Sequence, residues 1–212
     1  MFSNKDLRKL IIPLVIEQLL AVTIGMADTV MVSSCGEAAV SGISLVDSIN
    51  FLLITLFSSL ATGGAVIASQ YIGRGDHKSA SLAAKQLFYA SLALSAVLGV
   101  IAVFFRRPVL NMVFGSIEAD VMAHAQIYFL LSAISYPFLA VYNAGAALFR
   151  SMGDSRTTML ISILMNTINI VGNAILIYGF QMAAAGAATA SLVSRAVGAI
   201  IITVLLLSLI HI

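Results

Sequence analysis

LIIPLVIEQLLAVTIGMADTVMVS, residues 10–33, is an apolar stretch in which Glu17 and Asp28 are the only charged side chains. An α-helix rises about 1.5 Å per residue and the hydrocarbon core of a bilayer is about 30 Å thick, so this stretch is long enough to cross it. Five further apolar stretches follow, and glycines or charged residues mark the breaks between them. These stretches cover residues 43–72, 86–105, 124–149, 157–178 and 186–210. The pattern predicts an all-α fold, a polytopic membrane bundle of about six transmembrane helices.

The composition excludes most soluble classes of protein. Hydrophobic residues make up 60% of the chain and charged residues only 9%, with a mean hydropathy of +1.05, whereas soluble domains carry roughly 25% charged residues. The net charge of +2 comes without a basic patch, so nucleic acid is not an expected partner. The chain has one cysteine, Cys35, and no HExxH or GxSxG motif, so we expect no resident metal, no cofactor and no catalytic residues.

The distribution of Lys and Arg predicts the orientation in the membrane, because short cytoplasmic loops carry an excess of these residues. An N-terminus on the cytoplasmic side leaves only Arg106 and Arg107 on the outer side. The sequence therefore predicts a multi-pass protein of the cell membrane with a cytoplasmic N-terminus. The sixth stretch reaches the last residues with no basic flank after it, so we expect a fragment of a longer protein. The cations then placed inside are Lys5, Arg8, Lys9, Arg74, Lys78, Lys85, Arg150 and Arg156.

Ionisable residues within the apolar stretches are candidates for function, since such a group costs roughly 2.5 to 3.5 kcal/mol near the bilayer centre on insertion scales. The sequence places Glu17, Asp28, Asp47 and Arg195 in this position. Asp28 is expected in the outer part of the membrane and Glu17 near the inner side. The alternatives are that Asp28 is an interfacial or capping residue, that Glu17 bonds to a neighbouring helix, and that Arg195 is a structural clamp.

Three amides form a polar stripe on the fifth stretch. Asn166, Asn169 and Asn173 are three and four residues apart, which places them within about 60° of one another on a helix. Counted along their helices, Asn169 and Asn173 reach a depth close to that of Asp28. The stripe is therefore predicted to face Asp28, although interhelical Asn bonds also serve simply to hold membrane helices together.

Five segments resemble the multidrug and toxic compound extrusion (MATE) family of cation-coupled efflux transporters, in the order and spacing found in that family. The resemblance covers this whole chain but only the first six-helix lobe of the family's twelve helices. It implies a second, C-terminal lobe as a missing partner, a substrate cleft between the lobes, and alternating access by rocking. The segments are MADTVMVS (26–33), SQYIGRGD (69–76), RSMGDSRTTM (150–159), NIVGNAILIYG (169–179) and GAATASLVSR (186–195).

The resemblance also implies an ion-coupling site. The family's coupling carboxylate falls on Asp28 and its fifth-helix Asn on Asn169, while an acidic residue of some members is replaced here by Asn173. Ser191 lies where some members have a Thr. An Asn does not titrate, so proton coupling would depend on Asp28 with Glu17 as a second candidate, whereas Na⁺ could bind at Asp28, Asn169 and Asn173 because it prefers oxygen ligands. The sequence leaves both ions open.

The resulting functional hypothesis is an H⁺- or Na⁺-coupled antiporter that exports amphiphilic organic cations or drugs through the lipid bilayer. Glu17, Asn166, Ser191 and Arg195 are additional candidates for lining its cavity. The alternatives are a lipid-linked oligosaccharide flippase of the same superfamily, whose cavity would carry several cations, and a half-transporter fragment that does not transport. A non-catalytic scaffold subunit is a further alternative.

Overall fold

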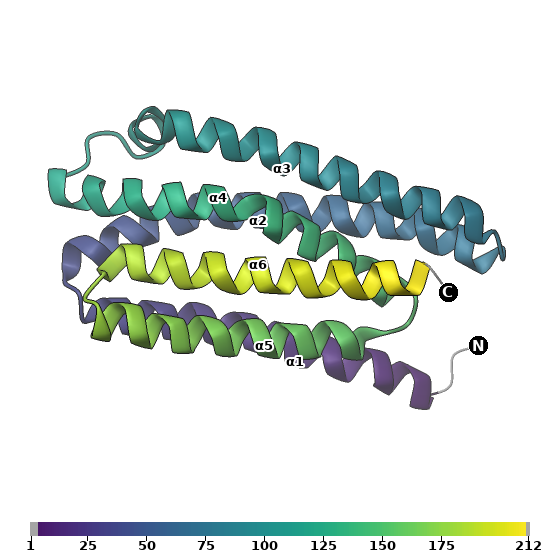
Figure 1. Cartoon of the computed structure of the whole chain (residues 1–212). Helices are drawn as coiled ribbons and strands as arrows, with labels where there is room; N and C mark the ends of the chain where they lie inside the picture. The colour runs from purple at the N-terminus through teal and green to yellow at the C-terminus, as the bar shows by residue number, and fades with distance from the viewer. Residues whose placement is uncertain (1–3, 211–212) are drawn as a thin grey trace.

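The computed structural model describes residues 4–210, so the first three and last two residues of the predicted 1–212 lobe lie outside it. Within this range the chain forms an antiparallel bundle of six long helices (Figure 1). All six are long and apolar enough to cross a membrane, which confirms the predicted all-α membrane bundle. The helices are α1 (Asn4–Ser33), α2 (Glu37–Gly73), α3 (His77–Phe114), α4 (Ala119–Ser151), α5 (Ser155–Asn173), continued by the π-helix η1 (Ala174–Gly179), and α6 (Ala183–Ile210).

Two of the helices are much longer than the hydrocarbon core of a bilayer requires. Helices α2 and α3 contain 37 and 38 residues, or roughly 55 Å at 1.5 Å per residue, well beyond a hydrocarbon core of about 30 Å. Arg106 and Arg107, expected in a loop, therefore lie inside α3. The helix kinks at Phe105 (φ −107°, ψ 19°), because Pro108 lacks an N–H donor and its ring crowds the preceding turn. The last turns of α3 run in a new direction after the kink (Figure 1).

Helix α4 lies at the centre of the bundle and packs against α2, α3 and α6, whereas α1 packs mainly on α5. Small residues allow this close packing. A Cβ atom built on Gly42 of α2 would lie 2.8 Å from the carbonyl oxygen of Val121, and one on Gly99 of α3 would lie 3.0 Å from that of Ala133. Both glycines thus bring a neighbouring helix into backbone contact with α4.

A buried polar network also connects α2 to α4. Asn50 of α2 is 3% exposed and accepts a 2.8 Å hydrogen bond from the hydroxyl of Tyr136, which is fully buried. Its amide nitrogen donates to Ser132 Oγ at 3.3 Å and to Asp47 Oδ1 at 3.3 Å. These bonds fix the register of α2 against α4, because an unpaired polar group inside a membrane bundle is costly.

The turns after α2 and after α4 have the same construction. Each contains a glycine with positive φ, Gly75 (φ +73°) and Gly153 (φ +86°), followed by an aspartate. Asp76 accepts a hydrogen bond from Ser79 N at 3.0 Å, and Asp154 accepts one from Thr157 N at 3.1 Å, so each aspartate caps the next helix. Both turns lie at the end of the bundle where α1 begins and α6 ends (Figure 1).

Candidate functional site

The candidate site is a cavity of about 440 Å³ between five helices, α1, α2, α4, α5 and α6. Its charged lining residues are Asp28, Asp47 and Arg195. Its wall includes aromatic and apolar side chains beside several amides and hydroxyls. The uncharged lining residues are Gly25, Asn50, Phe51, Ile54, Tyr128, Leu139, Tyr142, Ser162, Met165, Asn166, Asn169, Ser191 and Ser194.

A chain of hydrogen bonds across three helices connects residues on one side of the cavity through Asn173, which lies behind the lining. The amide nitrogen of Asn173 on α5 donates to Asp28 Oδ1 on α1 and to Asn169 Oδ1 at 3.3 Å. Asn169 in turn donates to Ser191 Oγ on α6 at 3.0 Å. The structure therefore brings together the three predicted ion-coupling residues and Ser191, although they are up to 163 positions apart in the chain.

The end of α5 has features that belong to this cluster. The π-helix begins at Ala174, immediately after Asn173, and such wide turns often occur at functional sites. Asn173 is fully buried, and its Oδ1 atom has no hydrogen-bond partner among the described residues. Native proteins rarely leave a buried acceptor unpaired. The amide that donates to the Asp28 carboxylate thus also carries a free oxygen, the type of ligand that a hard cation prefers.

The other side of the cavity contains a second carboxylate, Asp47 of α2. Its Oδ1 atom accepts hydrogen bonds from the Tyr128 hydroxyl at 3.0 Å and from the Asn50 amide at 3.3 Å. Arg195 of α6 donates to Ser135 Oγ on α4 at 2.6 Å. No carboxylate oxygen of the described residues lies within 4.0 Å of its guanidinium. Arg195 is thus held by a hydroxyl rather than by an ion pair.

Glu17 lies away from this cavity, because it is absent from the lining and has other partners. Its Oε1 atom is 3.2 Å from Arg150 Nη1, and its Oε2 atom accepts a hydrogen bond from Thr158 Oγ1 at 3.2 Å. These contacts join α1 to the ends of α4 and α5. They agree with the alternative in which Glu17 bonds to a neighbouring helix.

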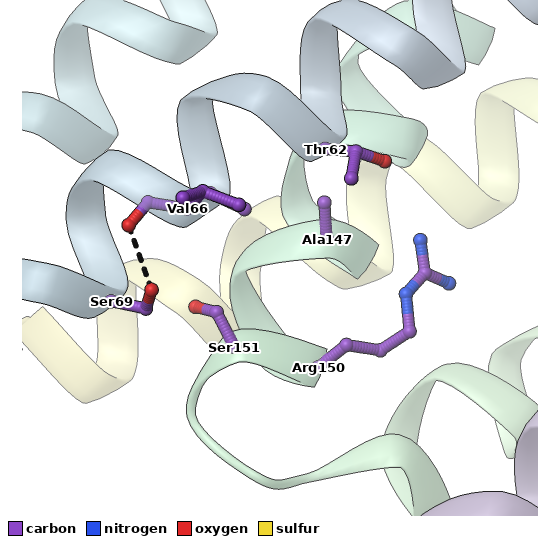
Figure 2. Close-up of a pocket in the computed structure, with 7 residues that line it drawn as sticks. Thr62, Val66, Ser69, Ala147, Arg150 and Ser151 are labelled. Atoms are coloured by element: carbon purple, nitrogen blue, oxygen red, sulfur yellow. Dashed lines mark hydrogen bonds between the residues drawn. The ribbon is translucent and has the colours of Figure 1, made fainter.

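Arg150 lies at the edge of a second, smaller cavity of about 320 Å³ between α2 and α4, near the capped turns (Figure 2). The Arg150 side chain extends away from the hydroxyls of Ser69 and Ser151, and Ser69 donates to the Val66 carbonyl at 2.7 Å (Figure 2). The hydroxyl of Ser151 likewise donates to a backbone carbonyl of its own helix. The polar groups of this small cavity are therefore mostly paired.

Sequence reasoning found part of the main cavity and missed the rest. Asn166, Ser191 and Arg195 line it as predicted candidates, but Asn166 makes no hydrogen bond to Asn169 or Asn173, and its Nδ2 atom is unpaired. The sequence predicts Asp47 as an intramembrane charge but gives it no role. The sequence does not predict the contributions of Asn50, Tyr128 and Tyr142. The only signal for Asn50 is its position three residues after Asp47, which places both side chains on one face of the helix.

Within the described residues, no three His, Cys, Asp or Glu side chains come together as a metal site would require. A comparison with models of protein families matches residues 13–175 of this chain to the MatE model. The chain belongs to the MatE family. MatE proteins are transporters, so the chain is a transporter-family membrane protein and not an enzyme.

Individual MatE relatives agree with this assignment. The chain is 32% identical over 205 residues to an uncharacterized transporter, YisQ, of Bacillus subtilis, and the match covers 91% of this chain and 43% of the relative. It is 31% identical over 209 residues to a probable multidrug resistance protein, NorM, of Thermotoga maritima, covering 94% and 44%. An outward-facing multidrug resistance MATE transporter superposes with a TM-score of 0.87 at 24% identity, covering 93% and 44%, which shows the shared fold. The chain spans less than half the length of these relatives.

Proposed function

We propose that this chain is a lobe of a cation-coupled antiporter that exports amphiphilic organic cations across the cell membrane by alternating access, with its N-terminus on the cytoplasmic side. The observation that carries the proposal is the link from Asp28 to Asn173, Asn169 and Ser191 at the edge of the 440 Å³ cavity. This cluster joins α1 to α5 and α6, so a change in its occupancy acts on three helices at once. Binding that favours one arrangement of these helices shifts the population toward it.

The chemistry of the cluster suits a small cation. The Asp28 carboxylate can take up a proton, and together with the unpaired Asn173 Oδ1 it offers Na⁺ two oxygen ligands. In an antiporter, this ion enters as the substrate leaves. The two carboxylates and single guanidinium of the cavity also favour a cationic substrate over a lipid phosphate, for which a lining of several cations would be expected.

The proposal is tested by reconstituting the chain in liposomes and following the movement of ethidium under an inward Na⁺ gradient or an inward H⁺ gradient. We expect one gradient to drive ethidium against its concentration, and the Asp28→Asn variant to lose this drive. Asp120→Asn is the matched control, because Asp120 is exposed and does not line the cavity. Unchanged gradient dependence in Asp28→Asn would refute the coupling role. Ion binding without any ethidium movement would instead favour the alternative of a lobe that cannot transport alone.

A further inference from the structure

We propose that Asp47, with the aromatic side chains beside it, is the binding site for the organic cation, separate from the ion site at Asp28. This inference rests on the proposed transport of organic cations and adds which carboxylate receives the substrate. It starts from the observation that the cavity contains two carboxylates in different surroundings. Asp28 is bonded to an amide of α5, whereas Asp47 is bonded to a phenol of α4 and an amide of its own helix.

The surroundings of Asp47 match the chemistry of a lipophilic cation. Tyr128 donates to Asp47, and Phe51 lies one turn further along α2 with 69% of its surface exposed. Both rings line the cavity, as does Tyr142. Aromatic faces attract cations, most strongly where water is excluded, and a nearby carboxylate adds its full charge. The apolar side chains of Ile54 and Leu139 complete a wall that organic groups can contact.

Asp47 retains free capacity for a ligand. Both hydrogen bonds that it accepts end on Oδ1, and none to Oδ2 is found among the described residues. The side chain of Asn166, 7% exposed on the cavity wall, has an unpaired Nδ2 atom, and the Tyr142 hydroxyl has no hydrogen bond of good geometry although Ser162 is its neighbour. A cavity wall with unpaired buried polar atoms indicates that a ligand or water completes it.

Arg195 and the two carboxylates together set the net charge of the cavity. With both aspartates ionised, the two carboxylates and one guanidinium of the lining give a formal charge of minus one. One monovalent cation, either the coupling ion at Asp28 or the substrate at Asp47, therefore neutralises the cavity. A second cation would leave an excess positive charge in a region of low dielectric constant, which is unfavourable. Two separate sites thus exclude each other, as an exchange mechanism requires.

The experiment measures binding of tetraphenylphosphonium to the purified chain in lipid nanodiscs, at varied Na⁺ concentration and varied pH. Asp47→Asn is the informative variant, because the Asn oxygen can still accept the bonds from Tyr128 and Asn50 while the charge is lost. We expect it to weaken tetraphenylphosphonium binding about tenfold to a hundredfold, with an unchanged thermal unfolding midpoint. Asp28→Asn should weaken the binding less than Asp47→Asn does, because it lowers the net negative charge of the cavity without removing the carboxylate beside the substrate, and it should lose the competition by Na⁺ or H⁺. Asp120→Asn should match the unsubstituted chain.

A second pair of variants removes a ring instead of a charge. Phe51→Leu should weaken tetraphenylphosphonium binding about two- to fivefold through the lost cation–π contact, whereas Phe104→Leu should not, since Phe104 is 76% exposed on α3 and outside the cavity. This pair also decides the matter if Asp47→Asn fails to fold. Unchanged binding in both Asp47→Asn and Phe51→Leu would overturn the assignment of the substrate to Asp47. An equal loss of binding in Asp28→Asn and Asp47→Asn would overturn it too. Neither result would overturn the proposed organic-cation function. An unsubstituted chain that binds no tetraphenylphosphonium would overturn the organic-cation function itself.

Discussion

Replacing Asn50 by Leu and Tyr136 by Phe, singly and together, tests whether the buried network holds α2 against α4. Tyr136→Phe leaves the Asn50 oxygen, 3% exposed, without its 2.8 Å donor. Asn50→Leu leaves the fully buried Tyr136 hydroxyl without its acceptor. A buried polar group left unpaired costs about 1–3 kcal/mol in soluble proteins, and interhelical bonds in a membrane protein average about 0.6 kcal/mol with a maximum near 1.7.

The burial and short distance of this bond place it at the upper end of the membrane range. We expect each single substitution to lower the free energy of unfolding by about 1–2 kcal/mol. The double substitution should cost about 1–1.7 kcal/mol less than the sum, because the bond between Tyr136 and Asn50 is then removed from both sides and neither substitution leaves the other side of that bond unpaired. The assay is unfolding by SDS in mixed micelles, followed by far-ultraviolet circular dichroism.

Tyr89→Phe is the control, since Tyr89 is 72% exposed on α3 and its loss of a hydroxyl should change stability by less than about 0.5 kcal/mol. Additive costs in the double substitution, within about 0.3–0.5 kcal/mol, would refute the reasoning. The polar residues would then be tolerated inside the bundle without connecting its helices.

Two further predictions concern the end of the bundle with the capped turns. Glu17→Gln should destabilise the chain by about 1–2 kcal/mol in the same assay, because Arg150 (29% exposed) and Glu17 (14% exposed) form a partly buried ion pair. In a chain that already carries Arg150→Met, the same substitution should cost much less. An equal loss of stability in that chain would contradict the prediction. The hydrogen bonds from Ser79 hold the pKa of Asp76 below its usual value, so the carboxylate stabilises the fold above the usual Asp range and this contribution is lost as the pH falls through it. Unfolding measured from neutral pH to below about 4 should therefore show a smaller loss in Asp76→Asn than in the unsubstituted chain, and equal losses would count against the cap.

The number of helices could be predicted from sequence because the bilayer fixes the length of an apolar span. Their ends could not, since α3 continues as a helix through Arg106, Arg107 and Pro108, where charge and proline suggest a loop. Beyond the hydrocarbon core, hydropathy no longer reports on helix length. Backbone hydrogen bonding continues there without an apolar pattern to mark it.

The cluster of Asp28, Asn169 and Asn173 could be predicted in part, because helical periodicity places the two Asn residues on one face of α5 and counting along the helices places Asp28 of α1 at a similar depth in the membrane. Helical spacing places Asn169 and Asn173 on one face, but it does not reveal that Asn166 stays unpaired. The cluster around Asp47 could not be predicted, because its partner Tyr128 comes from α4, 81 positions away. Such a contact depends on how two helices are rotated about their axes, and periodicity alone does not fix that rotation.

The π-helix after Asn173 lies between the polar stripe of α5 and the connection to α6. A turn closed by i→i+5 hydrogen bonds holds one residue more than an α-turn, so removing one residue between Ala174 and Gly179 would restore α-helical geometry there. Because the deleted residue is the extra one of the wide turn, the connection to α6 would keep its direction, and Asn169 and Asn173, which come earlier, would keep their positions. The wide turn would therefore let α5 lose one residue near its end without moving the polar stripe.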